Sequence, residues 1–290
     1  MRTEEAPIEG LHRPLRWWRE VLYILVMYAI YSAIRNLFGS AAVSPARALQ
    51  NAENLIGVER ALGLFHEQSI QDWFLPHDAV VRFWNIFYGT FHFVVTAAAL
   101  IWMYHSFPWR YAAWRNTLAI MTGLALIGFA LFPLMPPRLL NVPTCGEPIG
   151  PHADLSQDCS DYGGGSYAEE HYGFVDTLKE VGGLWSFDSG AVAEVSNQYA
   201  AMPSLHIGWS VWVTLVVYPQ LRRWWSRAIA IAYPLATLLC IMLTANHYWI
   251  DGVGGLVVLG TGWALGSRLA RLRTPRRVPE DEPATMSPAG

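Results

Sequence analysis

The chain has 290 residues, of which 53% are hydrophobic and only 15% are charged, and it contains 14 tryptophans and 13 tyrosines. A soluble domain of this length usually carries about 25% charged residues, so the deficit indicates a protein that is solvated partly by lipid. The formal net charge of -3 gives no reason to expect a nucleic-acid partner.

Six segments are apolar over about 20 residues, which is the length that an α-helix needs to cross the hydrocarbon core of a membrane. We therefore predict an all-α integral membrane protein, a six-transmembrane-helix bundle over residues 18–270, with a short tail at 1–17 and a disordered tail at 271–290. The predicted spans are Trp18–Phe38, Ala79–Tyr104, Tyr111–Leu134, Pro203–Tyr218, Ala228–Ala245 and Trp249–Leu269.

Two further segments differ from the spans in their pattern. Residues 44–75 are amphipathic at helical spacing, which predicts a helix or helix pair lying in the membrane interface. The polar side of this segment is expected to carry Glu53, Glu59, Arg60 and Glu67. Residues 138–201 are polar, acidic and rich in glycine, and they form the long loop between the third and fourth spans.

The distribution of arginine and lysine predicts the orientation. Six spans place both termini on one side of the membrane, and that side holds 14 of the 20 basic residues. By the positive-inside rule this side is cytoplasmic, so the long loop is extracytoplasmic. We expect a multi-pass protein of the plasma membrane.

The first span and the cysteines of the long loop leave alternatives open. The first span is either a retained anchor or a cleaved signal peptide, since small residues follow it; its length and its two flanking tryptophans favour an anchor. Cys145 and Cys159 both lie in the long loop, where an exterior compartment permits a disulfide without requiring one. Cys240 lies within the fifth span and is interpreted as a packing residue.

Three polar clusters lie at the outer ends of the spans. They are Pro136–Arg138 after the third span, Met202–His206 at the start of the fourth, and Asn246–Asp251 between the fifth and sixth. Because the topology puts all three at one depth on one side, we expect them to converge into one site. An ionisable residue at the edge of a span, such as Asp251, is costly there and usually functional.

These side chains suit phosphoryl transfer. His247 and Asp251 are four residues apart, so on a helical turn the carboxylate can hold one imidazole nitrogen and present the other as a nucleophile or base. His206 could donate a proton to a leaving group. Arg138 offers a planar fork for phosphate oxygens, and the first turn of the fourth span, at Ser204, offers free backbone N–H groups.

Pro203-Ser204-Leu205-His206 and His247-Tyr248-Trp249-Ile250-Asp251 resemble the second and third signature motifs of the type 2 phosphatidic acid phosphatase superfamily. The resemblance covers most of the chain, since six helices with an outer-face site is that superfamily's architecture. It implies that His247 attacks phosphorus to form a phosphohistidine, that Asp251 orients it, and that His206 protonates the leaving alcohol. It also implies that no metal or other cofactor is needed.

The chain departs from the superfamily's pattern at two cations. Leu131 stands where the first motif has a lysine, and Ile241 stands where the third motif usually has an arginine. The branch lacking these cations resembles inositol phosphorylceramide synthases and sphingomyelin synthases, which transfer a phosphorylated headgroup between lipids. The triplet Asn85, Tyr88 and His92 also resembles that branch and is expected to line one stripe of the second span toward the substrate.

The substrate is therefore expected to be a membrane lipid phosphoester, with water or a small or lipid alcohol as acceptor. Simple hydrolysis of a lipid or polyprenyl phosphate is the alternative to transfer. Two other interpretations are a zinc hydrolase with His206, His247 and Asp251 as ligands, and a lipid-binding scaffold without activity.

Overall fold

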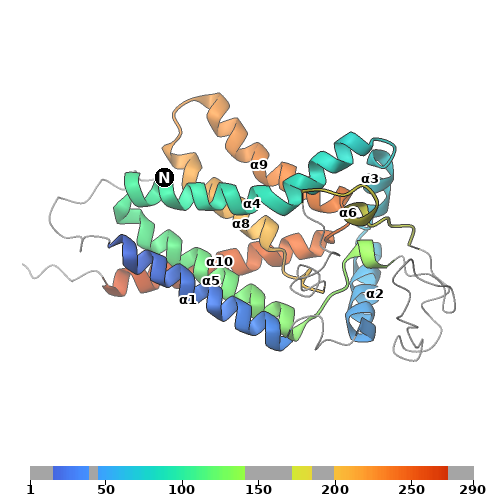
Figure 1. Ribbon diagram of the computed structural model, residues 1–290, viewed down its shortest axis with the longest axis horizontal. Coiled ribbons are helices and arrows are strands. Elements are labelled where there is room, and N and C mark those ends of the chain that lie inside the picture. The colour runs from blue at the N-terminus through green and yellow to red at the C-terminus, as the bar shows by residue number, and fades with distance from the viewer. Residues whose placement is uncertain (1–15, 39–44, 141–171, 185–198, 274–290) are drawn as a thin grey trace, which may run out of the picture.

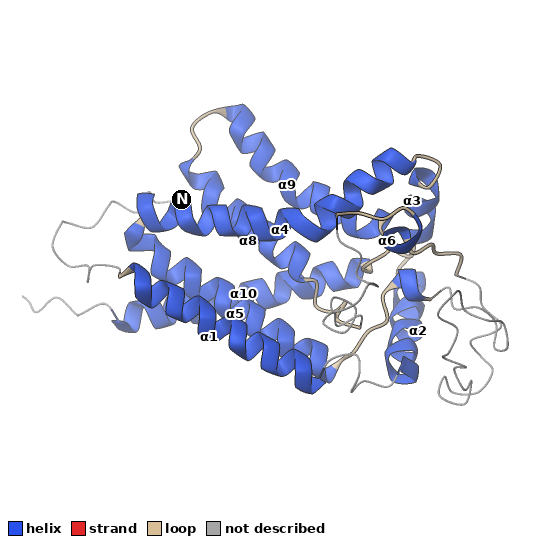
Figure 2. Cartoon of the chain, in the orientation of Figure 1, coloured by secondary structure: helices blue, strands red, loops and turns tan. Residues whose placement is uncertain are grey.

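The computed structural model describes residues 16–38, 45–140, 172–184 and 199–273. These residues are helical or loop, and within these ranges the only β-type pairing is an isolated bridge between Leu134 and Ala200. The elements are α1 (Trp17–Phe38), α2 (Pro45–Ala61), α3 (Glu67–Phe74), α4 (Asp78–Ser106), α5 (Pro108–Leu131), η1 (Pro137–Leu139), α6 (Thr177–Glu180), α8 (Leu205–Val217), η5 (Tyr218–Gln220), α9 (Trp224–Leu243) and α10 (Trp249–Arg273). Figure 2 shows the helices and their connecting loops.

The long helices run along the longest dimension of the molecule, and α2, α3 and α6 gather at one end of them (Figure 1). Four helices, α4, α5, α9 and α10, are long and apolar enough to cross a membrane. The prediction of an all-α membrane protein is confirmed at this level. Six crossings stay a prediction, because α8 has 13 residues and by itself spans only about 20 Å.

The helix boundaries differ from the predicted spans by up to four residues; α9, for example, begins at Trp224 and not at Ala228. The third predicted span extends to Leu134, but α5 ends at Leu131. Pro133 follows closely, and a proline disfavours helical geometry in the residue before it. The sixth predicted span ends at Leu269, whereas α10 continues to Arg273, so residues 271–273 of the predicted tail are helical.

The amphipathic segment forms a helix pair, α2 and α3, but the predicted polar side was wrong at two positions. The side chains of Glu59 and Glu67 are fully buried against the start of α10 and are not exposed to solvent. The apolar side of α2 packs in a core with Leu134 and Tyr248. The physical reason is that backbone N–H groups of α10 attract the two carboxyl groups into the protein.

Glycines of α10 allow its close contacts with α5 and α8. A Cβ atom on Gly262 would lie 2.8 Å from the carbonyl oxygen of Thr117, and a Cβ atom on Gly266 would lie 2.7 Å from the backbone nitrogen of Thr117. A Cβ atom on Gly255 would collide with the carbonyl oxygen of Ser204 at the start of α8. The absence of side chains at these points therefore lets the first turns of α8 and α10 meet.

The predicted packing role of Cys240 agrees with its place in α9. The residue is buried, and its thiol donates to the carbonyl of Trp84 at 3.3 Å, which links α9 to α4. Cys145 and Cys159 lie outside the described residues.

Candidate active site

Three segments that are distant in the sequence meet at the end of the bundle where α2, α3 and α6 lie. His206 is in the first turn of α8, His247 is in the turn between α9 and α10, and Asp251 is in the first turn of α10. Arg138 lies in η1, shortly after the end of α5. The structure places His247 in contact with both Asp251 and His206.

Asp251 holds His247. The Nδ1 atom of His247 lies 3.3 Å from Oδ2 of Asp251, and both side chains are buried. The same carboxylate oxygen accepts the backbone N–H of Tyr248 at 2.9 Å, as the acidic residue of a capping box does. With Nδ1 directed at the carboxylate, Nε2 is the nitrogen of His247 that points away from Asp251.

The end of α9 sets the position of His247. The N–H of Ala245 donates to the carbonyl of Met242, and the N–H of Asn246 donates to that of Ile241. With a φ of 52° at Ala245, these bonds form a Schellman motif, in which the residue after the helix is left-handed and usually glycine. Ala245 also accepts the backbone N–H of Arg138 at 2.7 Å, so η1 is fixed to the same turn.

His206 faces His247 from α8. Its Nδ1 atom lies 3.3 Å from Nε2 of His247, so Asp251, His247 and His206 form a continuous row. The N–H of Ser204 donates to the carbonyl of Asp251 at 2.9 Å and joins the two helices at this level. The Ser204 hydroxyl is buried and has no hydrogen-bond partner among the described residues, and its contact with substrate stays a prediction.

Helix α4 supports the imidazole of His206. The ring of Tyr88 stacks on it at a centroid distance of 4.3 Å and an angle of 17°. The ring of His92 lies 4.2 Å from it, and Nδ1 of His92 is buried without a hydrogen-bond partner among the described residues. These two predicted substrate contacts therefore border the histidine row, and their contact with substrate stays a prediction.

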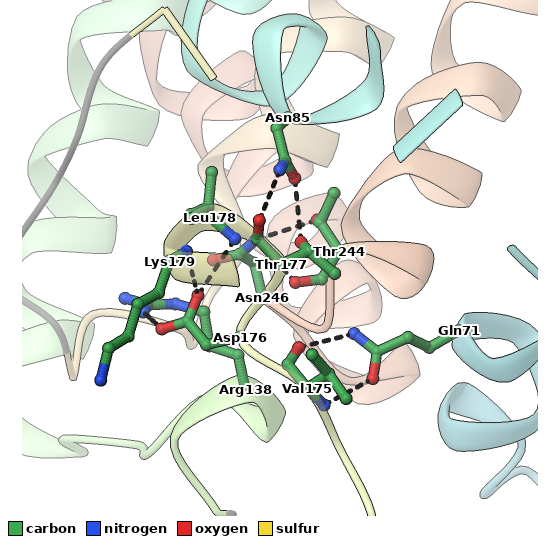
Figure 3. Close-up of polar contacts among 10 residues, drawn as sticks. All are labelled: Gln71, Asn85, Arg138, Val175, Asp176, Thr177, Leu178, Lys179, Thr244 and Asn246. Carbon is green, nitrogen blue, oxygen red and sulfur yellow. Dashed lines mark hydrogen bonds and ion pairs between the residues drawn. The ribbon is translucent and has the colours of Figure 1, made fainter. Parts of the chain in front are cut away.

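Asn85, the third member of that stripe, contacts the chain itself. Its amide donates to the carbonyls of Thr177 and Gly182 at 2.8 and 2.9 Å and accepts the Thr177 hydroxyl at 2.9 Å. Gln71 of α3 likewise exchanges two hydrogen bonds with the backbone of Val175 (Figure 3). Residues 175–182 are thus anchored to α3 and α4 beside the site, and a substrate role for Asn85 stays a prediction.

Arg138 is paired with an acidic residue of this same segment. Its Nη1 atom lies 2.6 Å from Oδ2 of Asp176, and both side chains are largely buried. Asp176 also caps α6 by accepting the N–H groups of Leu178 and Lys179 (Figure 3). The Nε atom of Arg138 is buried without a partner among the described residues. Sequence reasoning missed Asp176, because one acid in a long polar loop carries no spacing signal.

The two positions without the superfamily's cations supply no charge to the site. Ile241 is fully buried in an apolar cluster with Ile207 and Met242. The side chain of Leu131 is 68% exposed at the end of α5. Within the described ranges, no group of three or more His, Cys, Asp or Glu side chains is arranged to hold a metal ion.

A family model described as the PAP2 superfamily matches residues 53–265. The chain belongs to the PAP2 superfamily. No curated protein and no solved structure matches it. The PAP2 match extends from α2 into α10, so it includes every candidate site residue.

Members of the PAP2 superfamily are phosphatases, and membership supports an enzyme that acts on lipid-type phosphoesters. The resemblance drawn from the sequence motifs is confirmed at the level of the superfamily. The narrower resemblance to inositol phosphorylceramide synthases stays a prediction. In this PAP2 chain the residues of the second and third motifs, His206 and His247, lie next to each other.

Proposed function

We propose that the chain is a membrane phosphotransferase that cleaves a lipid phosphoester through a phosphohistidine intermediate. The row Asp251–His247–His206 carries this proposal. Nε2 of His247 forms a bond to phosphorus while the P–O bond to the leaving alcohol breaks, and His206 gives that oxygen a proton. An acceptor alcohol or water then attacks phosphorus, transfers its proton to His206 and releases His247.

Charge on the phosphoryl oxygens is met by backbone N–H groups and by Arg138. In α8 the N–H of Gly208 donates to the carbonyl of Ser204. The N–H groups before it, from Leu205 to Ile207, precede the regular helical bonds and form an anion site at a helix N-terminus. Arg138 adds a charged donor once its bond to Asp176 opens.

The electrostatics favour a phosphodiester over a phosphomonoester. Neither Leu131 nor Ile241 supplies a cation, and Asp176 balances the charge of Arg138. A monoester carries a charge of about -1.5 to -2 at neutral pH, whereas a diester carries a single negative charge. A site with little positive charge therefore suits transfer of a phosphorylated headgroup to an alcohol.

The site is proposed to face the outside of the plasma membrane. It lies at the end of the bundle opposite the start of α1 and the end of α10 (Figure 1). Those opposite ends carry Arg16, Arg19, Arg268 and Arg271. A cytoplasmic location of the arginine-rich end follows from the positive-inside rule and puts the histidines outside.

Turnover of labelled lipids in proteoliposomes tests the proposal. We expect label from a phosphodiester headgroup to appear on an added alcohol such as inositol, glycerol or a ceramide-like lipid, and His247→Ala to abolish this product. Release of free phosphate from monoesters alone would support the alternative, a simple lipid phosphatase. Activity abolished by EDTA and restored by zinc would contradict the phosphohistidine. Equal turnover by wild type and His247→Ala on every lipid tested would favour a scaffold.

A further inference from the structure

The first turn of α10, which carries Asp251, is capped by residues from other helices. The residue before α10 is Tyr248, whose side chain is not one of the short polar groups that cap helices. The N–H of Ile250 donates to Oε1 of Glu59 at 2.9 Å, and the N–H of Trp249 donates to Oε1 of Glu67 at 3.3 Å. One carboxyl group from α2 and one from α3 thus bind two consecutive N–H groups of this turn.

Both carboxyl groups are fully buried. Their second oxygens receive no hydrogen bond from an N–H or hydroxyl group of the described residues, which leaves the two carboxyl groups to bond to each other. Burial, the hydrogen bond to Glu67 and the charge of Glu67 raise the pKa of Glu59 to about 9, and the charge of Asp251 acts in the same direction. The pair therefore retains a proton at neutral pH.

We propose that Glu59 and Glu67 share one proton and, as a pair with a single negative charge, position the first turn of α10 and with it the His247–Asp251 contact. The inference rests on the proposed function in that it assigns both glutamates as positioning residues for the histidine nucleophile. One negative charge is favourable at a helix N-terminus. Two adjacent buried negative charges would repel each other and separate α2 from α3 at this point.

The proton explains why both residues are acidic. A carboxyl group that keeps its proton can donate to its neighbour, while each Oε1 atom still accepts a backbone N–H of α10. Two carboxylates have four acceptor oxygens and no donor, so they cannot make the bond between them. Loss of the shared proton is expected to loosen the turn that carries Asp251.

Glutamine substitutions test the pair, because an amide keeps the donor and the acceptor but removes the ionisation. In Glu59→Gln the amide can donate to Glu67 and still accept from Ile250. We expect turnover at neutral pH to fall by about threefold, within the range of one altered hydrogen bond. We expect the kcat of wild type to decline above about pH 9 and this decline to be absent in the variant. Glu59→Ala should lower kcat by about a hundredfold through misplacement of the nucleophile, with a smaller change in KM.

Glu53→Gln is the matched control, since Glu53 lies on the same helix and is partly exposed. It should keep both the wild-type rate and the wild-type pH profile. An alkaline decline that persists unchanged in Glu59→Gln and Glu67→Gln would overturn the proposal. So would a kcat of Glu59→Ala equal to that of Glu53→Gln.

Two measurements do not depend on turnover and separate failure of this inference from failure of the proposed function. Infrared spectra of the membrane-bound protein should show a protonated carboxyl band at neutral pH that is lost in Glu59→Gln and kept in Glu53→Gln.

Thermal unfolding gives the second measurement. Because the pKa of Glu59 rises from 4.5 to about 9, folded protein binds more protons between these values and wild-type stability falls as pH rises through that window. Glu59→Gln should flatten this decline of stability with pH. If stability in the variant declines as steeply as in wild type and the infrared band is retained, the proposal of a shared proton is overturned.

Discussion

The Nδ1 atom of His247 lies 3.3 Å from Oδ2 of Asp251, and the carboxylate that it meets is fully buried and also accepts the N–H of Tyr248. One carboxylate oxygen therefore fixes both the start of α10 and the orientation of the imidazole. As a consequence, Nε2 of His247, the proposed nucleophile, is directed at His206.

Asp251→Asn is expected to reduce kcat by about a thousandfold with little change in KM, since the neutral amide keeps the volume but does not stabilise the positively charged imidazole. The variant should retain the helical circular dichroism of wild type, because the amide oxygen can still accept the N–H of Tyr248. Kinetic constants of purified Asp251→Asn check this. A kcat within about threefold of wild type would show that the carboxylate does not orient the nucleophile.

His206→Ala is expected to discriminate between leaving groups. If His206 protonates the departing oxygen, a substrate with a low-pKa leaving group needs that proton less than a natural ester does. The rate should fall by about a thousandfold on the natural ester and by about tenfold on an activated aryl ester. Equal losses on both substrates would argue against His206 as the acid.

Asp176→Asn should release Arg138 while preserving α6, because asparagine caps a helix as well as aspartate does. The KM for an anionic substrate is expected to fall by about threefold to tenfold as Arg138 becomes available. Unliganded protein should melt at a lower temperature, because a largely buried charge loses its partner. Glu180→Gln, at an exposed position of the same helix, is the control. A raised KM in Asp176→Asn would mean that Asp176 holds Arg138 in its binding position.

Gly255→Ala is expected to separate the two histidines. The added Cβ atom meets the carbonyl oxygen of Ser204, which is backbone and cannot turn aside. The substitution should destabilise the protein by about 1–3 kcal/mol and lower kcat strongly. Gly260→Ala lies on the same helix in open space and should be neutral or slightly stabilising. Thermal unfolding and kcat of the two variants provide the comparison, and equal behaviour would contradict the close packing of α8 on α10.

The histidine row could be predicted from the sequence because its signals are local. A spacing of four residues put Asp251 within reach of His247, and the positions of both histidines at ends of apolar segments put them at one depth. The structure adds the contact itself, 3.3 Å between the two imidazoles, which depends on glycine contacts along α10 that no spacing reveals.

The partners of Glu59 and Glu67 could not be predicted in the same way. On an amphipathic helix, a charged residue usually faces solvent, so the sequence predicts that Glu59 and Glu67 lie on the polar side of residues 44–75. Their true partners are backbone N–H groups about 180 to 190 residues further along the chain. Backbone donors have no identity in the sequence, so only the folded chain shows that these acids are buried.

Trapping the phosphoenzyme tests the central claim most directly. Purified protein would be mixed with lipid labelled at phosphorus, quenched under alkaline denaturing conditions that preserve phosphohistidine, digested and mapped. The predicted result for wild type is one labelled peptide that contains His247. This peptide should be absent in His247→Ala. It should be enriched in His206→Ala if the second step also needs His206. Label retained by His247→Ala, or carried by another residue in wild type, would contradict the assignment of His247 as the nucleophile.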